Sequence, residues 1–306
     1  MIIRVLGSAA GGGFPQWNCN CRNCTGVRRG TLRTRARTQS SLAVRGSAPH
    51  DWVLVNASPD ILAQLQAHPE LQPARAARDT AIAGIVLVDG QVDHTTGLYM
   101  LRESVRPLAV WCTAQAHADL TRGNPIFGVL GHYCGIEWHA LSADGSEFTV
   151  AGVAGVSWRA LAVASKPAPY SPHRDAPAQG DNIALLLTDA ASGRAALYAP
   201  GLGAIDDAVW AAMQSAACVL VDGTFWTDDE MIGLRVSKKR ARDIGHLPQS
   251  GRGGMLEWLA KLPAATRKIL IHVNNTNPIL DEDSPQRAEL DRRGVEVAYD
   301  GMEIVL

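Results

Sequence analysis

The chain has 306 residues, of which 46% are hydrophobic and 19% charged, and this is enough for a sizeable buried core. Its formal net charge of −1 argues against a general nucleic-acid-binding protein, which usually carries a basic face. No apolar run approaches the roughly 18 residues of a membrane helix. The N-terminal residues also lack the features of a signal peptide, so we expect a cytoplasmic protein without a membrane span.

The first half of the chain alternates strand-like and helix-like segments. Strands are expected at 1–6, 40–46, 52–57, 82–90 and 108–113, and two more at 146–163. Helices are expected at 58–68, 95–104 and 114–123. Ser58 is a plausible N-cap of the first of these helices, because its hydroxyl can accept from a free backbone N–H.

The second half begins with residues 165–181, which contain several prolines and few apolar residues. This composition predicts an exposed or lid-like loop. Strands are then expected at 182–189, 195–201, 218–223, 268–274 and 295–306, and helices at 205–216, 253–262 and 284–294. Strands with helices interspersed on both sides predict an α/β sandwich rather than a purely parallel sheet.

Three of the six cysteines crowd into the stretch "CNCRNC" as Cys19, Cys21 and Cys24. In a reducing compartment, clustered thiols favour a metal over a disulfide. We therefore predict a closed structural zinc site in the loop near 17–26, with a fourth ligand (His, Asp, Asn or Cys) from elsewhere in the chain. The alternative is three free surface cysteines, which would be prone to oxidation.

Polar side chains also follow two apolar strands. Asp93 and His94 come after the strand that ends near Asp89, and His272 ends the strand "ILIH". Side chains at the carboxyl ends of strands often form sites. Taken alone, Asp93 could instead cap a helix and His94 could be a hydrogen-bonded histidine.

Several segments together resemble the pyrroloquinoline quinone (PQQ) biosynthesis protein B family. They are "GSAAGGGFPQWNCNC", "DHTTGL", "APYSPHR", "YAPGLG", "VDGTFW", "GHLPQ", "HVNNTNPILDEDSP" and "VEVAYDGMEI". The resemblance spans essentially the whole chain, and the wider superfamily is metallo-β-lactamase-like. It implies one αββα sandwich domain over 1–306, with the site at the edge between the two sheets.

The superfamily's hydrolases hold two metal ions, and this sequence matches only part of that site. Asp89 and Gln91 stand in place of the two leading histidines, and Pro200 stands near the place of the bridging Asp. Asp93, His94 and His272 match three ligands of the second metal. Two histidines and one carboxylate form the facial triad of non-heme iron(II) oxygenases. A two-metal hydrolase needs both ions, so the pattern favours a mononuclear iron site.

The resemblance further implies iron- and oxygen-dependent hydroxylation of the tyrosine ring of a Glu–Tyr unit from a precursor peptide. Asp89 would be a ligand or would orient a ligand histidine. His246 would be a general acid/base, or else an ordinary loop histidine. The expected cofactors are Fe(II) and a structural zinc, with molecular oxygen as co-substrate. The rivals are a metal-dependent hydrolase and a non-catalytic PQQ carrier.

The expected partners are the Glu–Tyr peptide or its cross-linked derivative, other PQQ-pathway proteins and a second copy of the chain. Nucleic acid and membrane are not expected. Arginines crowd residues 22–37. Such a run is usually a solvated face, although it could also dock carboxylates, because the arginine fork binds them in bidentate fashion.

Overall fold

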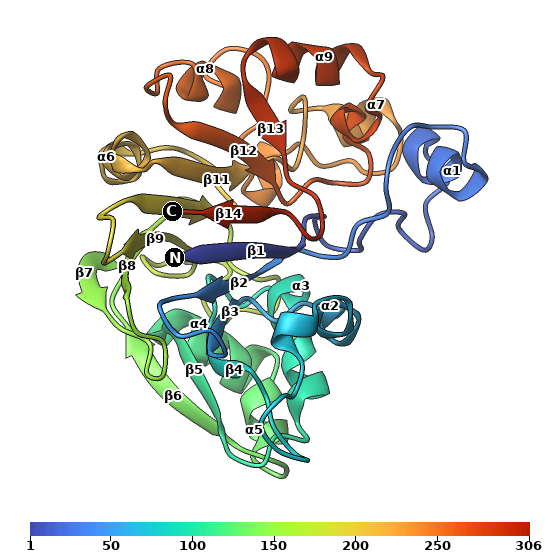
Figure 1. Cartoon of the computed structure of the whole chain (residues 1–306). Coiled ribbons are helices and arrows are strands. Elements are labelled where there is room, and N and C mark those ends of the chain that lie inside the picture. Colours follow the sequence, from blue (N-terminus) through green and yellow to red (C-terminus); the bar gives the residue numbers. More distant parts are fainter.

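The protein is a four-layered sandwich in which two sheets stack face to face and helices cover both outer faces (Figure 1). The computed structural model describes all 306 residues. The predicted αββα fold class is confirmed. None of the helices combines the length and the apolar character that crossing a bilayer requires.

The first sheet has seven strands in the order β14-β1-β2-β3-β4-β5-β6. Their bounds are β1 Ile2–Gly7, β2 Ser41–Arg45, β3 Trp52–Val55, β4 Ile82–Val86, β5 Leu108–Thr113, β6 Ile136–Leu141 and β14 Glu303–Val305. Strands β3 to β6 run parallel, so their carboxyl ends meet at one edge of the sheet.

The second sheet also has seven strands, in the order β13-β12-β11-β10-β9-β8-β7. Their bounds are β7 Asp144–Phe148, β8 Val156–Ala162, β9 Ile183–Asp189, β10 Ala195–Ala199, β11 Cys218–Asp222, β12 Arg267–Ile271 and β13 Val295–Val297. Strands β10 to β13 are parallel, and their carboxyl ends also share one edge.

The helices are short. Their bounds are α1 Arg22–Arg29, α2 Ile61–Ala67, α3 Val92–Thr95, α4 Ala114–Ala118, α5 Ile126–Leu130, α6 Asp207–Ser215, α7 Glu230–Gly233, α8 Met255–Leu259 and α9 Pro285–Arg292. Single 3-10 turns lie at Pro69–Leu71, Thr96–Leu101, Arg242–Ile244 and Pro278–Leu280, and a π-helical turn at Asp119–Gly123.

Three apolar cores hold the layers together. The central one lies between the sheets and contains Trp158 and Tyr198, both fully buried. The outer core of the first sheet includes Leu54 and Ile61, and that of the second includes Met213. Each fully buried side chain of this size contributes roughly 1.5–3 kcal/mol, so the cores fix the sheet edges on which the polar side chains sit.

Four local predictions are wrong. The last strand, 295–306, is two strands: β13 pairs in the second sheet and β14 in the first, because the chain turns at Gly301, where φ is +92°. Ser58 does not cap α2, since its hydroxyl accepts from Asp60 N and Asp60 is the N-cap residue.

The helix expected at 95–104 is a 3-10 turn following α3. Helix α1 lies where no helix is expected, because its buried face is made of Asn23, Cys24 and Gly26 rather than of large apolar residues.

Candidate metal centre

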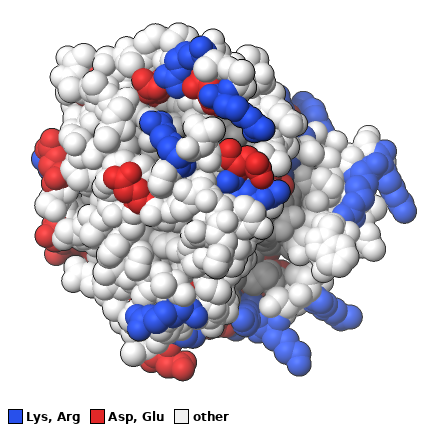
Figure 2. All heavy atoms as spheres, turned by 90° about the horizontal axis from the view of Figure 1, so that it is seen from below, with Lys and Arg blue, Asp and Glu red and all other residues white.

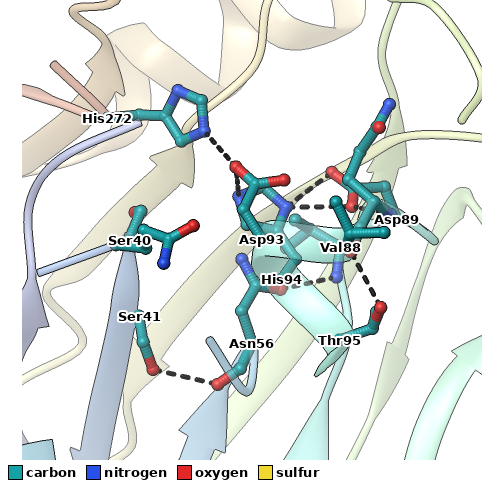
Figure 3. A network of polar contacts seen from close by, with 12 residues as sticks. Ser40, Ser41, Asn56, Val88, Asp89, Asp93, His94, Thr95 and His272 are labelled. Atoms are coloured by element: carbon teal, nitrogen blue, oxygen red, sulfur yellow. Dashed lines mark hydrogen bonds and ion pairs between the residues drawn. The ribbon is translucent and has the colours of Figure 1, made fainter. Parts of the chain in front are cut away.

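Three side chains of types that can bind a metal meet where β4 and β12, one strand from each sheet, come to an end. Asp93 and His94 lie in α3, shortly after β4, and His272 directly follows β12. Figure 3 shows their side chains pointing toward one another from opposite layers. Gly97 lets this loop pack closely against the segment that follows β3, because a Cβ there would lie 2.1 Å from Ser58 O.

The geometry of this group suits a metal ion. Nε2 of His272 lies 3.2 Å from Oδ2 of Asp93, and Nε2 of His94 lies 3.8 Å from the same oxygen. The three ligand atoms fall within 4.8 Å of one another. Nε2 of His94 is buried and has no hydrogen-bond partner. An unpaired buried nitrogen is costly, and a cation between the three groups would satisfy it.

Each histidine is held through its other ring nitrogen. Nδ1 of His94 lies 2.9 Å from both carboxylate oxygens of Asp89. Nδ1 of His272 lies 3.0 Å from Oγ1 of Thr224. Such contacts fix the tautomer and the ring orientation of metal-binding histidines. The structure thus places Asp89 behind His94, and it adds Thr224, for which no sequence signal stands out.

Charges around this group are strongly coupled. Burial alone would lower the pKa of His94, but the carboxylates of Asp89 and Asp93 raise it to about 9. Burial opposes ionisation of Asp93 as well, yet His94 and His272 hold its pKa well below the usual range. The site therefore stabilises a negative carboxylate facing positive charge. Binding a metal cation there would displace a proton from His94.

His246 lies beside the three ligands without joining them. Its ring stacks on that of His272, with centroids 5.5 Å apart. Its Nδ1 lies 2.7 Å from Oδ2 of Asp222, the last residue of β11, and 3.1 Å from Oγ1 of Thr224. Burial opposes protonation, but Asp222 raises the pKa of His246. The pair is arranged to hold a proton next to the proposed metal ligands.

The positions that hold the first metal in two-metal hydrolases are used differently here. Asp89 faces His94, and Gln91 donates from Nε2 to Lys166 O at 3.3 Å. Pro200, which has no ligating atom in its side chain, follows β10. The residues present therefore assemble one group of three ligands at this edge.

The proline-rich loop packs over this edge. The hydroxyl of Tyr170 donates to Gly90 O, and burial raises the pKa of Tyr170 to about 12. The prediction for 165–181 is an exposed or lid-like loop, and the buried Ala168 and Ser171 show that this part is not simply exposed. Residues 175–179 are exposed as predicted.

The three clustered cysteines converge at the start of α1. Their sulfurs lie within 4.8 Å of one another, and Cys21 is the N-cap residue, accepting from Cys24 N. Nδ2 of Asn275, a buried residue, lies 3.1 Å from Sγ of Cys19 and 3.4 Å from Sγ of Cys24. Burial raises the pKa of Cys21 to about 12, an effect that a bound cation would reverse.

Charged side chains do not form one continuous face. The view from below shows scattered basic and acidic groups separated by uncharged areas, with basic groups on the projecting segment that contains α1 (Figure 2). Several arginines of 22–37 are paired within the chain: Arg22 with Asp281 at 2.6 Å, and Arg33 with Glu282 at 3.3 Å. The run is thus only partly a solvated face.

Comparisons with known proteins agree with this architecture. Residues 51–273 match the family model described as the beta-lactamase superfamily domain. The chain is 66% identical to the coenzyme PQQ synthesis protein B of Azoarcus sp. (strain BH72) and 57% identical to that of Methylococcus capsulatus (strain ATCC 33009 / NCIMB 11132 / Bath), each over 306 residues covering 100% of both chains.

Solved structures show the same relationship. The crystal structure of zinc-bound PqqB from Methylobacterium extorquens superposes with a TM-score of 0.90 at 34% identity, covering 100% of both chains. A diphosphatase from the PhnP family reaches a TM-score of 0.66 at 15% identity, covering 99% of this chain and 96% of that one, which shows a shared fold alone. The chain therefore belongs to the coenzyme PQQ synthesis protein B family, within the beta-lactamase superfamily.

Proposed function

We propose that this protein hydroxylates the tyrosine ring of a Glu–Tyr intermediate in PQQ synthesis, using one iron(II) ion and molecular oxygen. The observation that carries the proposal is the ligand set, in which two imidazole Nε2 atoms and one carboxylate face one another. Asp89, Gln91 and Pro200, at the positions of the other metal in two-metal hydrolases, form no second group of this kind. Two histidines and a carboxylate leave coordination positions open for oxygen and substrate.

Asp93, His94 and His272 would hold the iron, which would supply oxygen activation. Asp89 and Thr224 keep both ligand rings in the tautomer that presents Nε2. His246, whose pKa is raised by Asp222, is placed to exchange a proton with a bound phenol. One oxygen atom of O₂ enters the ring. The other leaves as water, with two protons and two electrons from an added reductant.

The cysteine cluster would hold a structural zinc ion. Three thiolates from Cys19, Cys21 and Cys24 need one more ligand for a tetrahedral closed site. Asn275 contacts these sulfurs through its amide, and a half-turn of that amide would present Oδ1 instead. We therefore propose Asn275 as the fourth ligand.

Oxygen consumption with Glu–Tyr tests the proposed reaction. Protein purified without air is reloaded with iron(II) or zinc, given ascorbate as reductant, and followed by an oxygen electrode and mass spectrometry. We expect iron-dependent uptake and a product heavier by one oxygen atom, both lost in His272→Ala. His132→Ala, an exposed histidine away from the site, is the control.

Other outcomes point to the rival functions. Absence of uptake with either metal would contradict the hydroxylase. Hydrolysis that needs two ions at the site of Asp93, His94 and His272 would then favour a hydrolase, and tight quinone binding unaffected by His272→Ala would favour a carrier.

A further inference from the structure

A cavity of about 530 Å³ lies apart from the metal centre, between α9, β13 and the segment before β2. No residue of the proposed metal centre lines it. Arg35, Arg37 and Arg287 line it together with Tyr299. A volume of this order accommodates a small organic ligand.

Arg37 is a buried cation without a carboxylate partner. Arg37 is only 5% exposed, and no Asp or Glu oxygen lies within ion-pair distance of its guanidinium. Nη1 donates to Ala298 O and to Oγ of Ser8, whereas Nε is buried and unpaired. The nearby carboxylate of Asp300 accepts from Ser8 and Thr38 instead. The charge of Arg37 is therefore offset only in part, by the nearby carboxylates of Asp300 and Glu282, and no ion pair holds it directly.

The other two arginines also keep free donors. Arg35 lies over the Tyr299 ring, with its guanidinium carbon 5.1 Å from the ring centroid, and forms no ion pair. Arg287 donates from Nη1 to Ile279 O at 3.2 Å, and its single carboxylate neighbour is Asp291 at 4.0 Å, the limit of an ion pair. The Asp291 side chain is 71% exposed, so this contact is weak.

Acidic residues on the cavity wall do not neutralise this charge. Glu282 pairs with Arg33 at 3.3 Å, and Glu296 pairs with Arg267 at 2.6 Å. Both partners lie outside the cavity lining. Burial lowers the pKa of Arg37 to about 10; Asp300 and Glu282 oppose this effect, while the like charges of Arg287 and Arg35 add to it. Three arginines and three acidic residues line the cavity, but Glu282 and Glu296 are engaged outside it and Asp291 lies at the ion-pair limit from Arg287, so the arginines keep free donors.

We propose that this cavity binds a small ligand that carries several carboxylates. The guanidinium of Arg37 lines the cavity and can donate to a carboxylate there. Arg35 and Arg287 offer further donors at other points of the wall, which suits separated negative charges better than one compact anion. The Arg35–Tyr299 stack adds a flat surface for a planar ligand.

Titration calorimetry of the metal-loaded protein with trimesate, a planar tricarboxylate, tests the site. Inorganic phosphate is the second probe, and the ionic strength is held constant with chloride. We expect saturable trimesate binding that Arg287→Gln and Arg35→Gln each weaken roughly tenfold. Arg292→Gln, the same charge change at an exposed position of α9, should leave the affinity unchanged.

Two further variants distinguish binding in this cavity from binding at the metal centre. Binding should persist in His272→Ala, since loss there would place the ligand at the metal centre. Arg37→Lys keeps the charge but removes the fork, so binding should weaken while the melting temperature confirms folding. Equal affinity in Arg287→Gln and Arg292→Gln, or no saturation, would overturn the proposal. Tighter binding of phosphate than of trimesate would overturn the carboxylate assignment.

Discussion

Both carboxylate oxygens of Asp89 lie 2.9 Å from Nδ1 of His94, on the opposite ring nitrogen from the one that faces Asp93. Asp89 occupies a position where two-metal hydrolases of this fold are expected to carry a histidine. In this chain the residue at that position contacts a proposed ligand, His94, instead of joining the proposed ligand set. This contact makes Asp89 a positioning residue whose effect is exerted through His94.

Replacing Asp89 by Asn should weaken metal binding at the centre. The amide keeps an acceptor but loses the negative charge that orients the imidazole and makes it more basic. Losses of roughly 10–100-fold in affinity are typical of such supporting contacts. Competition with a chromophoric chelator measures the change. Asp144→Asn, at a position that makes only local turn contacts, should behave as the unaltered protein, and an equal loss there would refute the role of Asp89.

Cys24→Ala should remove one tightly bound zinc ion per chain and lower the melting temperature. The thiolate would be one of four ligands, and structural zinc contributes directly to folding. Cys112→Ala is a matched control, because Cys112 is also fully buried but lies away from the cluster. Metal analysis and thermal unfolding decide the matter: unchanged zinc content in Cys24→Ala would contradict the zinc site.

Glu230 should make the protein less stable as pH rises. Burial raises its pKa to about 7 in the folded chain, above the ordinary value of 4.5. The folded state therefore holds this proton more tightly than the unfolded chain. Its contribution is present below about pH 4.5, is lost progressively up to about pH 7, and amounts to at most about 3 kcal/mol.

Urea unfolding at pH 5 and pH 8 measures this effect. Glu230→Gln keeps the size of the side chain and a neutral head, so its unfolding free energy should change less between the two pH values. The variant should be the more stable form at pH 8. Parallel pH profiles of the two proteins would show that Glu230 does not hold a proton.

Tyr170→Phe should loosen the proline-rich loop from the loop that carries the metal ligands. The change removes the hydroxyl that donates to Gly90 O and leaves that carbonyl without this partner. We expect a loss of about 1 kcal/mol in stability and faster proteolysis within 165–181. Tyr133→Phe is the control, because Tyr133 is 59% exposed. Equal cleavage of both variants would argue against a role for the contact.

Much of the fold is predictable because the strands are apolar and bounded by glycine and polar residues. The strand at β12 and the helix at α6 are examples. The last strand is divided at Asp300 and Gly301, a typical turn pair, but the pairing of its two halves with different sheets cannot be seen in the sequence. Helix α1 is hard to predict because it depends on its caps and on contacts of Asn23 with the loop after β12, and its buried face has no large apolar residues.

The site is predictable to a similar extent. Asp93, His94 and His272 stand out because each follows an apolar strand, and the structure brings them together. Thr224 and Asn275 do not stand out. Both act through contacts between segments that are distant in sequence, and hydroxyl and amide groups are common in loops.

His272 adopts a backbone conformation with φ of +62°, a region that residues with a Cβ enter at a cost of roughly 1–2 kcal/mol. Glycine would relieve this strain, at the price of the imidazole. Selection of variants for heat resistance alone would therefore favour His272→Gly, which removes one of the three proposed ligands. Variant libraries of this protein need a screen for metal content alongside the screen for thermal tolerance.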